Sequence, residues 1–292
     1  MRLEDRGKLY SPKTINHIKE RYGFKLSKSL GQNFLTDKNI IDKIIESSEV
    51  TSKDTVIEIG PGIGVITAEA AKLARDVIAI EIDKNLIPIL NETLGEYDNV
   101  HVINQDVLKT DVNEIIKEYK CENVKIISNL PYYITTPILM YLLENQVNAE
   151  SITVMMQKEV GDRIKAKEGT KAYGAISVAI QYYCYVETVV SVPKTVFVPP
   201  PKVDSVVLKL TRRKEPPVQL IDSKMFFKTV GAGFGQRRKT LLNSLSSMDS
   251  VSKDTVKSCL NDLNIDEKRR AETLSIDEFA AIANYLTKAL EV

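Results

Sequence analysis

The chain has 292 residues, 43% of them apolar, and a formal net charge of +1; its length predicts one large and one small domain, and its composition excludes a wholly disordered chain. No apolar run approaches the roughly 18 residues of a membrane span, and the first residues lack the apolar segment of a secretory signal. Because Cys121, Cys184 and Cys259 lie far apart and the chain has 2 histidines, we expect a cytoplasmic protein without a metal site.

The small net charge hides an uneven distribution along the chain. Residues 1–30 carry a net charge of +5 and residues 202–292 a net charge of +4, whereas residues 31–201 carry −8. Basic ends around an acidic centre suit a polyanion that is held at the edges of a site with carboxylates of its own. Ordinary solvated faces explain the same charges, so the pattern alone assigns no partner.

Taken in chain order, the first two thirds of the chain predict alternating helices and strands. Ser11 and Pro12 begin a short helix that ends near Arg21. Residues 25–35 have no clear period and predict a loop, after which Asp37 caps a helix with an isoleucine stripe. Strand-like runs then alternate with segments long enough for crossover helices; they lie at 55–59, 76–82, 100–104, 124–128, 151–156, 186–192 and 205–211. This order predicts an α/β, Rossmann-like parallel sheet covered on both faces.

A charged segment with two prolines at residues 211–217 predicts a domain boundary. Beyond it we expect helices without strands, the last of which begins at Ser275, where Glu278 completes a capping box. The sequence therefore predicts a Rossmann-like domain over residues 1–210 and a helical domain over residues 211–292. The helical part shows no heptad seam, so we expect a monomer.

The ends of the first three strand-like runs predict a nucleoside cofactor. The first run leads into Gly60-Pro61-Gly62-Ile63-Gly64, where glycines let the backbone turn sharply and approach a ligand closely. The second run ends at Glu81, whose carboxylate can accept both hydrogens of a ribose diol. Asp106, after the third run, can accept a hydrogen bond from an adenine amino group, although a helix cap is the ordinary role of a single aspartate there. These features leave open a dinucleotide or S-adenosylmethionine.

The end of the fourth run favours methylation of an amine over hydride transfer. It reads Ser128-Asn129-Leu130-Pro131-Tyr132-Tyr133, and Pro131 biases Leu130 towards an extended conformation. The side-chain oxygen of Asn129 and the carbonyl of Leu130 are adjacent acceptors for the hydrogens of an exocyclic amine, whose delocalised lone pair they would restore. Tyr132 can lie against a base lifted from its stack. The alternative is an ordinary strand-to-helix turn, for which Asn-X-Pro is common.

A proline-braced segment at residues 196–205 carries a second prominent aromatic residue, Phe197. Taken alone, Phe197 is a candidate for the core. The prolines that fix the path of the segment also allow a surface-presented ring, which would stack on the base opposite Tyr132. Such stacking is worth ~1–3 kcal/mol per base.

Basic clusters flank these motifs and predict contacts with RNA phosphates. Gln236-Arg237-Arg238-Lys239 follows a predicted glycine-rich turn at residues 231–235, and Lys268-Arg269-Arg270 lies farther along. Each cluster is also typical of a solvated surface, and the argument for RNA comes from the base-binding motifs that they flank. The candidate RNA-binding residues are Lys25, Lys28, Lys202, Arg237, Arg238 and Lys239.

Seven segments match, in order, the motifs of one known family. They are KSLGQNFL at 28–35, IEIGPGIGVIT at 57–67, IEID at 80–83, NQDVL at 104–108, SNLPYYITTPI at 128–138, VFVPPPKVDS at 196–205 and GFGQRRKTLLNSL at 233–245. In these segments the chain closely resembles the 16S ribosomal RNA adenine dimethyltransferases, whose bacterial forms confer sensitivity to kasugamycin.

The resemblance implies a cofactor, a substrate and a site. The substrate would be two adjacent adenines in the 3′-terminal hairpin loop of 16S ribosomal RNA, each converted to N6,N6-dimethyladenine within a partly assembled small subunit. The base would be held by Asn129, Leu130, Pro131, Tyr132 and Phe197. S-adenosylmethionine would be bound by Asn33, Leu35, Gly60, Glu81, Asp106 and Asn129.

Other interpretations remain open at this point. Enzymes that dimethylate an adenine of 23S ribosomal RNA and confer macrolide resistance share the glycine loop and the NLPY-like turn, although the basic QRRKTLLNSL segment favours the small-subunit enzyme. DNA adenine methyltransferases use a similar turn, more typically with proline where this chain has Leu130. A non-catalytic RNA-binding factor on the same fold and a nicotinamide dehydrogenase are the alternatives from other classes.

Overall fold

The computed structural model describes residues 9–23, 31–249 and 251–290, and the chain divides into two compact units. Unit 1 comprises Met1–Gly161 and Val186–Arg212, and unit 2 comprises Asp162–Tyr185 and Arg213–Val292. The chain enters unit 2 for the last time after Arg212, close to the boundary expected at residue 210. Residues 162–185, however, group with the C-terminal helices. The reason is apolar contact, because buried side chains of this stretch belong to the same core cluster as those of the C-terminal helices.

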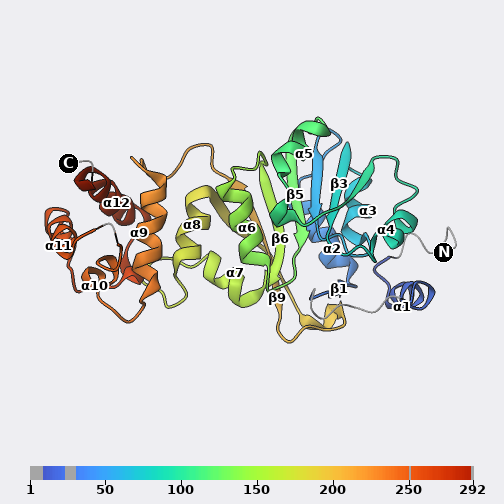
Figure 1. The fold of residues 1–292 in the computed structure, drawn as a ribbon. Coiled ribbons are helices and arrows are strands. Elements are labelled where there is room, and N and C mark those ends of the chain that lie inside the picture. Colours follow the sequence, from blue (N-terminus) through green and yellow to red (C-terminus); the bar gives the residue numbers. More distant parts are fainter. Residues whose placement is uncertain (1–8, 24–30, 250, 291–292) are drawn as a thin grey trace. The chain divides into compact units, whose positions relative to one another are not determined.

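Unit 1 is built on a 7-stranded sheet of order β4-β3-β2-β5-β6-β9-β7 (Figure 1). Neighbouring strands from β4 to β6 pair in parallel, and β6 pairs antiparallel with β9. The sheet confirms the α/β, Rossmann-like class that the sequence predicts, but it is mixed rather than wholly parallel, because β9 runs antiparallel to β6. Its strands are β2 (Thr55–Ile59), β3 (Asp76–Glu81), β4 (Val100–Asn104), β5 (Val124–Asn129), β6 (Ser151–Gln157), β7 (Cys184–Val192) and β9 (Ser205–Arg212).

Helices connect the strands, and short polar side chains cap several of them. Ser11 accepts a hydrogen bond from the backbone of Thr14, and Asp37 accepts two from the first turn of its helix, which satisfies donors that lack intrahelical partners. The helices of unit 1 are α1 (Pro12–Arg21), α2 (Lys38–Ser48), α3 (Val65–Ala71), α4 (Ile87–Thr93), α5 (Val112–Glu118) and α6 (Thr135–Glu144); α7 (Lys158–Ile164) crosses into unit 2.

Both faces of the central parallel strands β2, β3 and β5 are buried. Val56, Val77 and Ile127 belong to one apolar cluster with buried residues of α2, α3 and α4. The next residues along two of these strands, Ile57 and Ile78, point to the opposite face because side chains alternate along a strand, and they are fully buried as well. Burial on both faces explains why these strands read as continuous β-branched runs.

A second, 2-stranded sheet is formed by two of the segments that carry the sequence motifs. It pairs β1 (Phe34–Leu35) antiparallel with β8 (Phe197–Val198). The described part of the predicted loop at residues 25–35 therefore ends in a short strand. This pairing holds the segment 31–36 against the proline-braced segment, and Thr36 extends it with a backbone hydrogen bond of 2.8 Å to the carbonyl of Val196.

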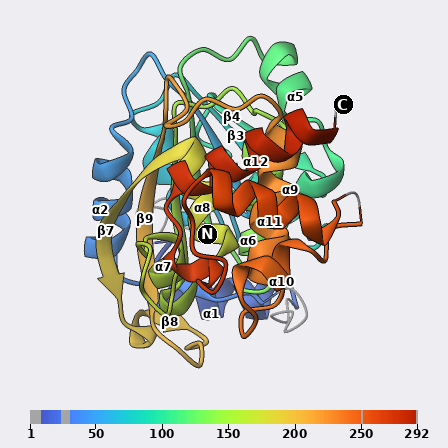
Figure 2. The same cartoon turned by 90° about the vertical axis from the view of Figure 1, so that its left-hand side faces the viewer.

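Unit 2 is helical, as expected. Its helix α9 contacts α8, α10 and α12, and α11 contacts α10 and α12 (Figure 2). Ser275 and Glu278 exchange the two hydrogen bonds of the predicted capping box at the start of α12. The helices are α8 (Ala175–Tyr183), α9 (Ser223–Gly235), α10 (Leu241–Leu245), α11 (Lys253–Asp262) and α12 (Ile276–Leu290). No helix among the described residues is long and apolar enough to cross a membrane.

The glycine-rich stretch at residues 231–235 is not a turn, contrary to expectation, because it forms the last part of α9. A Cβ atom on Gly233 would lie 3.2 Å from the Cβ of Ala271 and 3.3 Å from the ring of Phe279. Close packing of α9 against these residues thus explains a glycine inside a helix, where its intrinsic propensity is poor.

Candidate active site

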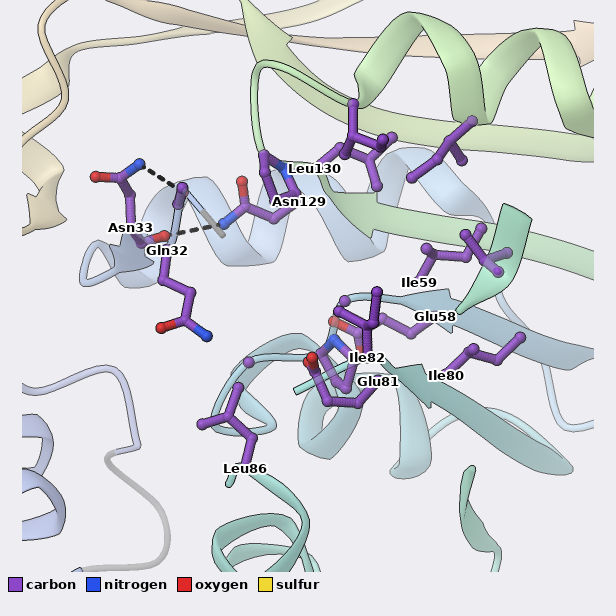
Figure 3. A pocket seen from close by; sticks show the side chains of 18 of the residues that line it. Gln32, Asn33, Glu58, Ile59, Ile80, Glu81, Ile82, Leu86, Asn129 and Leu130 are labelled. Atoms are coloured by element: carbon purple, nitrogen blue, oxygen red, sulfur yellow. Dashed lines mark hydrogen bonds between the residues drawn. The ribbon is translucent and has the colours of Figure 1, made fainter. Parts of the chain in front are cut away.

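One cavity of about 200 Å³ opens at the carboxyl ends of the parallel strands in unit 1 (Figure 3). All ten residues that the motifs and the family resemblance assign to the cofactor or the base line this cavity, although they come from six separate segments of the chain. This is the edge of the sheet at which open α/β folds bind ligands. The ten are Asn33, Leu35, Gly60, Glu81, Asp106, Asn129, Leu130, Pro131, Tyr132 and Phe197.

The glycine loop forms the floor of the cavity after β2. Gly60 and Gly62 have φ angles of 71° and 61°, values that residues with a Cβ adopt at a cost. A Cβ on Gly62 would lie 3.0 Å from the ring of Phe34. Glycine at this position therefore serves both the backbone conformation and the close approach of the segment 31–36.

Glu81 is the last residue of β3, and its carboxyl group is nearly buried and accepts hydrogen bonds from backbone nitrogens. Its side chain is 4% exposed, and its Oε1 accepts a hydrogen bond of 2.7 Å from the backbone nitrogen of Asp83. Burial raises the pKa of Glu81 to about 7, against the opposing effect of backbone donors that include Gly62. A ligand whose hydroxyls donate to this group stabilises its ionised form.

Glu58 is a second buried carboxyl group on the wall of the cavity. It is the next-to-last residue of β2 and is 1% exposed, and its Oε2 accepts a hydrogen bond of 2.5 Å from the hydroxyl of Thr67. Burial raises the pKa of Glu58 to about 8, and the charge of Glu81 adds to the increase. At neutral pH Glu58 is therefore mostly a neutral acid.

The turn after β5 is tied to two neighbouring segments. The hydroxyl of Ser128 donates a hydrogen bond of 2.5 Å to the carbonyl of Ile59 at the end of β2. The side-chain nitrogen of Asn129 donates to the backbone carbonyl of Asn33 over 3.4 Å, as drawn in Figure 3. The side-chain oxygen of Asn129 is not used in this bond. Asn129 thus lies in the same cavity as Gly60 and Glu81 rather than in the core.

The two aromatic candidates have different surroundings. The hydroxyl of Tyr132 lies 2.7 Å from the Oγ of Ser205, which fixes the ring at the cavity, and burial raises the pKa of Tyr132. Phe197 is 3% exposed and belongs to the apolar core cluster. The expectation of a surface-presented Phe197 is therefore wrong, because β8 pairs this residue with Leu35 and turns it into the cavity wall.

Asp106 caps a helix, as the ordinary role of an aspartate at this position predicts, and it also lies at the cavity, where contact with an adenine amino group stays a prediction. Its Oδ1 accepts a hydrogen bond of 3.1 Å from the backbone nitrogen of Leu108, which caps the 3-10 helix Val107–Lys109. The same residue lines the cavity. Capping directs the carboxylate at the end of β4 without removing it from the site.

Sequence reasoning did not single out several other residues that line the cavity, among them Gln32, Glu58, Ile82 and Tyr133. Glu58 could have been found from the sequence, because a single acidic residue inside the apolar run TVIEI is expected to be buried without access to solvent. Tyr133 directly follows a residue that was chosen and is 58% exposed. Gln32 and Ile82 carried no distinguishing pattern.

The candidate RNA-binding residues are placed only in part. Lys25 and Lys28 lie outside the described residues, whereas Lys202 in unit 1 is exposed. In unit 2, Arg237, Arg238 and Lys239 are exposed in the turn after α9.

Two arginines of unit 2 are partly engaged within the protein. A nitrogen of Arg237 donates to the carbonyl of Lys171 over 2.7 Å. Arg269 forms a two-point ion pair with Glu278, at 2.5 and 3.0 Å. The contribution of Arg269 to a basic RNA-binding cluster is therefore not supported, because its guanidinium is used to fasten the start of α12.

The similarity of this chain to known proteins covers nearly its whole length. The family model described as ribosomal RNA adenine dimethylase matches residues 23–288. A protein of Clostridioides difficile named ribosomal RNA small subunit methyltransferase A is 51% identical over 280 residues, which cover 96% of this chain and 97% of that protein. A protein of the same name from Bacillus cytotoxicus is 53% identical over 281 residues, covering 94% and 96%.

Solved structures agree with the sequence relatives. The crystal structure of a dimethyladenosine transferase from Plasmodium falciparum is similar with a TM-score of 0.75 and 26% identity, covering 87% of this chain and 97% of that chain. The crystal structure of the 23S rRNA methyltransferase ErmE is similar with a TM-score of 0.65 and 26% identity, covering 87% and 99%. Because the family match runs through the segments of both units, the chain belongs to the ribosomal RNA adenine dimethylase family.

Proposed function

We propose that this protein transfers methyl groups from S-adenosylmethionine to N6 of two adjacent adenines in the 3′-terminal hairpin loop of 16S ribosomal RNA. The observation that carries the proposal is the gathering of all ten predicted cofactor and base residues around one cavity. The relatives above 50% identity are named as small-subunit methyltransferases, which favours 16S over 23S ribosomal RNA. The substrate would be the small subunit or its precursor, and the enzyme would act as a monomer.

The cavity fits S-adenosylmethionine, which supplies an electrophilic methyl group on a positively charged sulfur when bound. Glu81 offers a carboxylate oxygen for the ribose diol, and its buried position makes each such hydrogen bond strong. Ile82 and Leu108 offer apolar surface for the adenine ring, and Asp106 an acceptor for its amino group. The ionised form of Glu81 also favours a cationic ligand over a neutral one.

The base would be activated by oxygen acceptors rather than by a strong base. The free oxygen of Asn129 and the carbonyl of Leu130 accept the two hydrogens of the N6 amine and localise its lone pair on nitrogen. Tyr132, fastened by Ser205, supports the face of the base. Aligning the nitrogen with the methyl group and its sulfur accounts for the rest of the rate enhancement. The methyl transfer needs no metal in this scheme.

Exposed cations in both units would hold the RNA backbone. Lys202 belongs to unit 1, and Arg238 and Lys239 belong to unit 2. Phosphate contacts of this kind position an RNA without reading its sequence. Recognition of the two adenines would then come from the cavity itself.

The test is a methylation assay with labelled S-adenosylmethionine on small ribosomal subunits from a strain without dimethyladenine. We expect label in 16S ribosomal RNA as N6,N6-dimethyladenine at two adjacent positions, found by nuclease digestion and mass spectrometry. Deproteinised 23S ribosomal RNA from an unmethylated strain is the parallel substrate. Label in 23S and none in 16S ribosomal RNA would replace the proposal by the ErmE-like activity, and no label with retained RNA binding would favour a non-catalytic factor.

A further inference from the structure

The segment 31–36 crosses the cavity and is fastened at the ends of three strands. Phe34 and Leu35 pair with β8, and Thr36 donates to the carbonyl of Val196 through both its backbone nitrogen and its hydroxyl, at 2.8 Å each. Asn33 accepts the hydrogen bond from Asn129 after β5. Each of these contacts fixes the segment on the side of the cavity that receives the base.

Gln32 makes the corresponding contact on the opposite side, after β3. Its side-chain nitrogen donates a hydrogen bond of 2.8 Å to Oδ2 of Asp83. Asp83 is 7% exposed, and its other oxygen accepts two hydrogen bonds from Asn85, at 3.0 and 2.9 Å. The backbone nitrogen of Asp83 in turn donates to the carboxyl group of Glu81 over 2.7 Å. A continuous chain of hydrogen bonds therefore links the segment 31–36 to the acidic end of β3.

We infer that Gln32 is a positioning residue for cofactor binding: by bonding Asp83 it docks the segment 31–36 against the loop that presents Glu81 to the ribose. The inference rests on the proposed function, in that it assigns the ribose to Glu81. The acceptor is a carboxyl oxygen of a residue that is 7% exposed, so water competes little for the hydrogen bond. Figure 3 shows Gln32 reaching from this segment towards the Glu81 side of the cavity.

The polarity of the bond gives a specific test. Gln32→Glu keeps the size of the side chain and replaces the donor by a carboxylate that faces Asp83 and Glu81. Asp83→Asn in the same protein supplies a new donor to that carboxylate, so the double variant Gln32→Glu/Asp83→Asn re-forms the bond in the reverse direction. Gln219→Glu, on an exposed side chain of unit 2, is the control for the added charge.

Two measurements on the full chain report separately on docking of the segment 31–36 and on ligand binding. Hydrogen exchange of the backbone amides of residues 31–36 in the ligand-free protein reports whether the segment is docked. Calorimetric titration with 5′-methylthioadenosine reports the ribose and adenine site without the methionine amino group, which itself titrates at about pH 8. We expect Gln32→Glu to speed exchange and to weaken binding on the order of ten- to a hundred-fold at pH 8, and the double variant to reverse most of both changes.

The pH dependence separates positioning from general damage. Lowering the pH protonates Glu81 and weakens binding by the wild-type protein. In Gln32→Glu it also protonates the new carboxylate, which becomes a donor to Asp83, so the difference in affinity between variant and wild type becomes smaller. A deficit that stays constant with pH, a double variant no better than the single one, or unchanged exchange and affinity in Gln32→Glu would each overturn the inference. Faster exchange without weaker binding would also overturn it. Absence of binding by the wild-type protein would instead refute the proposed cofactor, while the exchange data would still decide whether Gln32 docks the segment.

Discussion

The side-chain nitrogen of Asn129 lies 3.4 Å from the backbone carbonyl oxygen of Asn33, 96 positions earlier in the chain. The bond orients the carboxamide, because its nitrogen faces the segment 31–36 and its oxygen is left for another donor. A residue of the turn after β5 is thus oriented by the segment 31–36, which also lines the cavity. In the proposed function, this residue would therefore join cofactor binding to activation of the base.

Asn129→Ala is expected to lower the rate of methyl transfer by about 100-fold or more, the range found when one stabilising polar group is removed from an active site. Binding to small subunits should be largely kept, because the residues proposed to contact phosphates lie elsewhere. Single-turnover methylation and a filter-binding assay on the same preparation measure the two effects. Turnover at the wild-type rate would refute activation by the Asn129 oxygen.

Binding of the cofactor should strengthen as the pH rises through about 7. The carboxyl group of Glu81 has a pKa of about 7 in the free protein, and hydroxyls that donate to its ionised form lower that pKa, so binding releases a proton at lower pH. The association constant of 5′-methylthioadenosine should fall up to about tenfold per pH unit well below 7. Titration calorimetry from pH 5.5 to 8.5 measures this slope. Glu81→Gln should bind more weakly and with a flat profile, and a retained slope in that variant would assign the proton to another group.

Glu58→Gln should stabilise the protein at high pH and leave its stability nearly unchanged at low pH. Burial raises the pKa of Glu58 in the folded protein to about 8, above its value in the unfolded chain. Its favourable contribution is therefore fully present below the unfolded pKa and is lost as the pH rises through about 8. The difference between variant and wild type should grow by up to about 1.4 kcal/mol per pH unit between these values.

Urea denaturation between pH 5 and 9 measures the effect of Glu58→Gln on the free energy of unfolding. Glu144→Gln, at an exposed side chain of α6, is the matched control for loss of a carboxylate. A difference that does not depend on pH would show that Glu58 is already ionised in the folded protein.

Gly62→Ala should weaken cofactor binding, whereas Gly169→Ala should not. Both glycines have left-handed φ angles, 61° and 80°, so each substitution should cost about 1–2 kcal/mol of backbone strain. A Cβ on Gly62 would meet the ring of Phe34 at 3.0 Å, while one on Gly169 meets nothing within 4 Å. Thermal unfolding measures the loss of stability from backbone strain, and cofactor titration measures the loss of affinity from displacement of the segment 31–36. Equal losses of affinity in the two variants would contradict the steric account.

Arg238→Ala/Lys239→Ala should weaken binding to small subunits and reduce its dependence on salt. Removing one cation that neutralises a phosphate lowers the slope of log K against log salt by roughly 1. Lys253→Ala/Lys257→Ala removes two exposed cations of α11 in the same unit and serves as the control. Filter binding at several salt concentrations gives both slopes. Identical slopes for the two double variants would remove this turn from the RNA-binding surface.

Much of the site could be predicted because its chemistry is encoded in short, contiguous segments. The central parallel strands β2, β3 and β5 appeared as β-branched runs because both of their faces are buried. The glycine loop after β2 and the Asn-Leu-Pro-Tyr turn after β5 appeared because each needs particular residue types at adjacent positions. Once the strands are parallel, their carboxyl ends must meet at one edge of the sheet, so the placement of Glu81 and Asn129 around one cavity follows from local patterns and topology.

What the tertiary structure alone decided depends on contacts between residues far apart in the chain. Phe197 is buried because β8 pairs with β1, and the raised pKa of Glu58 comes from burial and from the charge of Glu81. The residues 231–235 are helical because α9 packs closely on Ala271 and Phe279. Gln32 meets Asp83 across 51 positions. No local pattern encodes these relationships, because burial and through-space charge are properties of the folded neighbourhood rather than of any one segment.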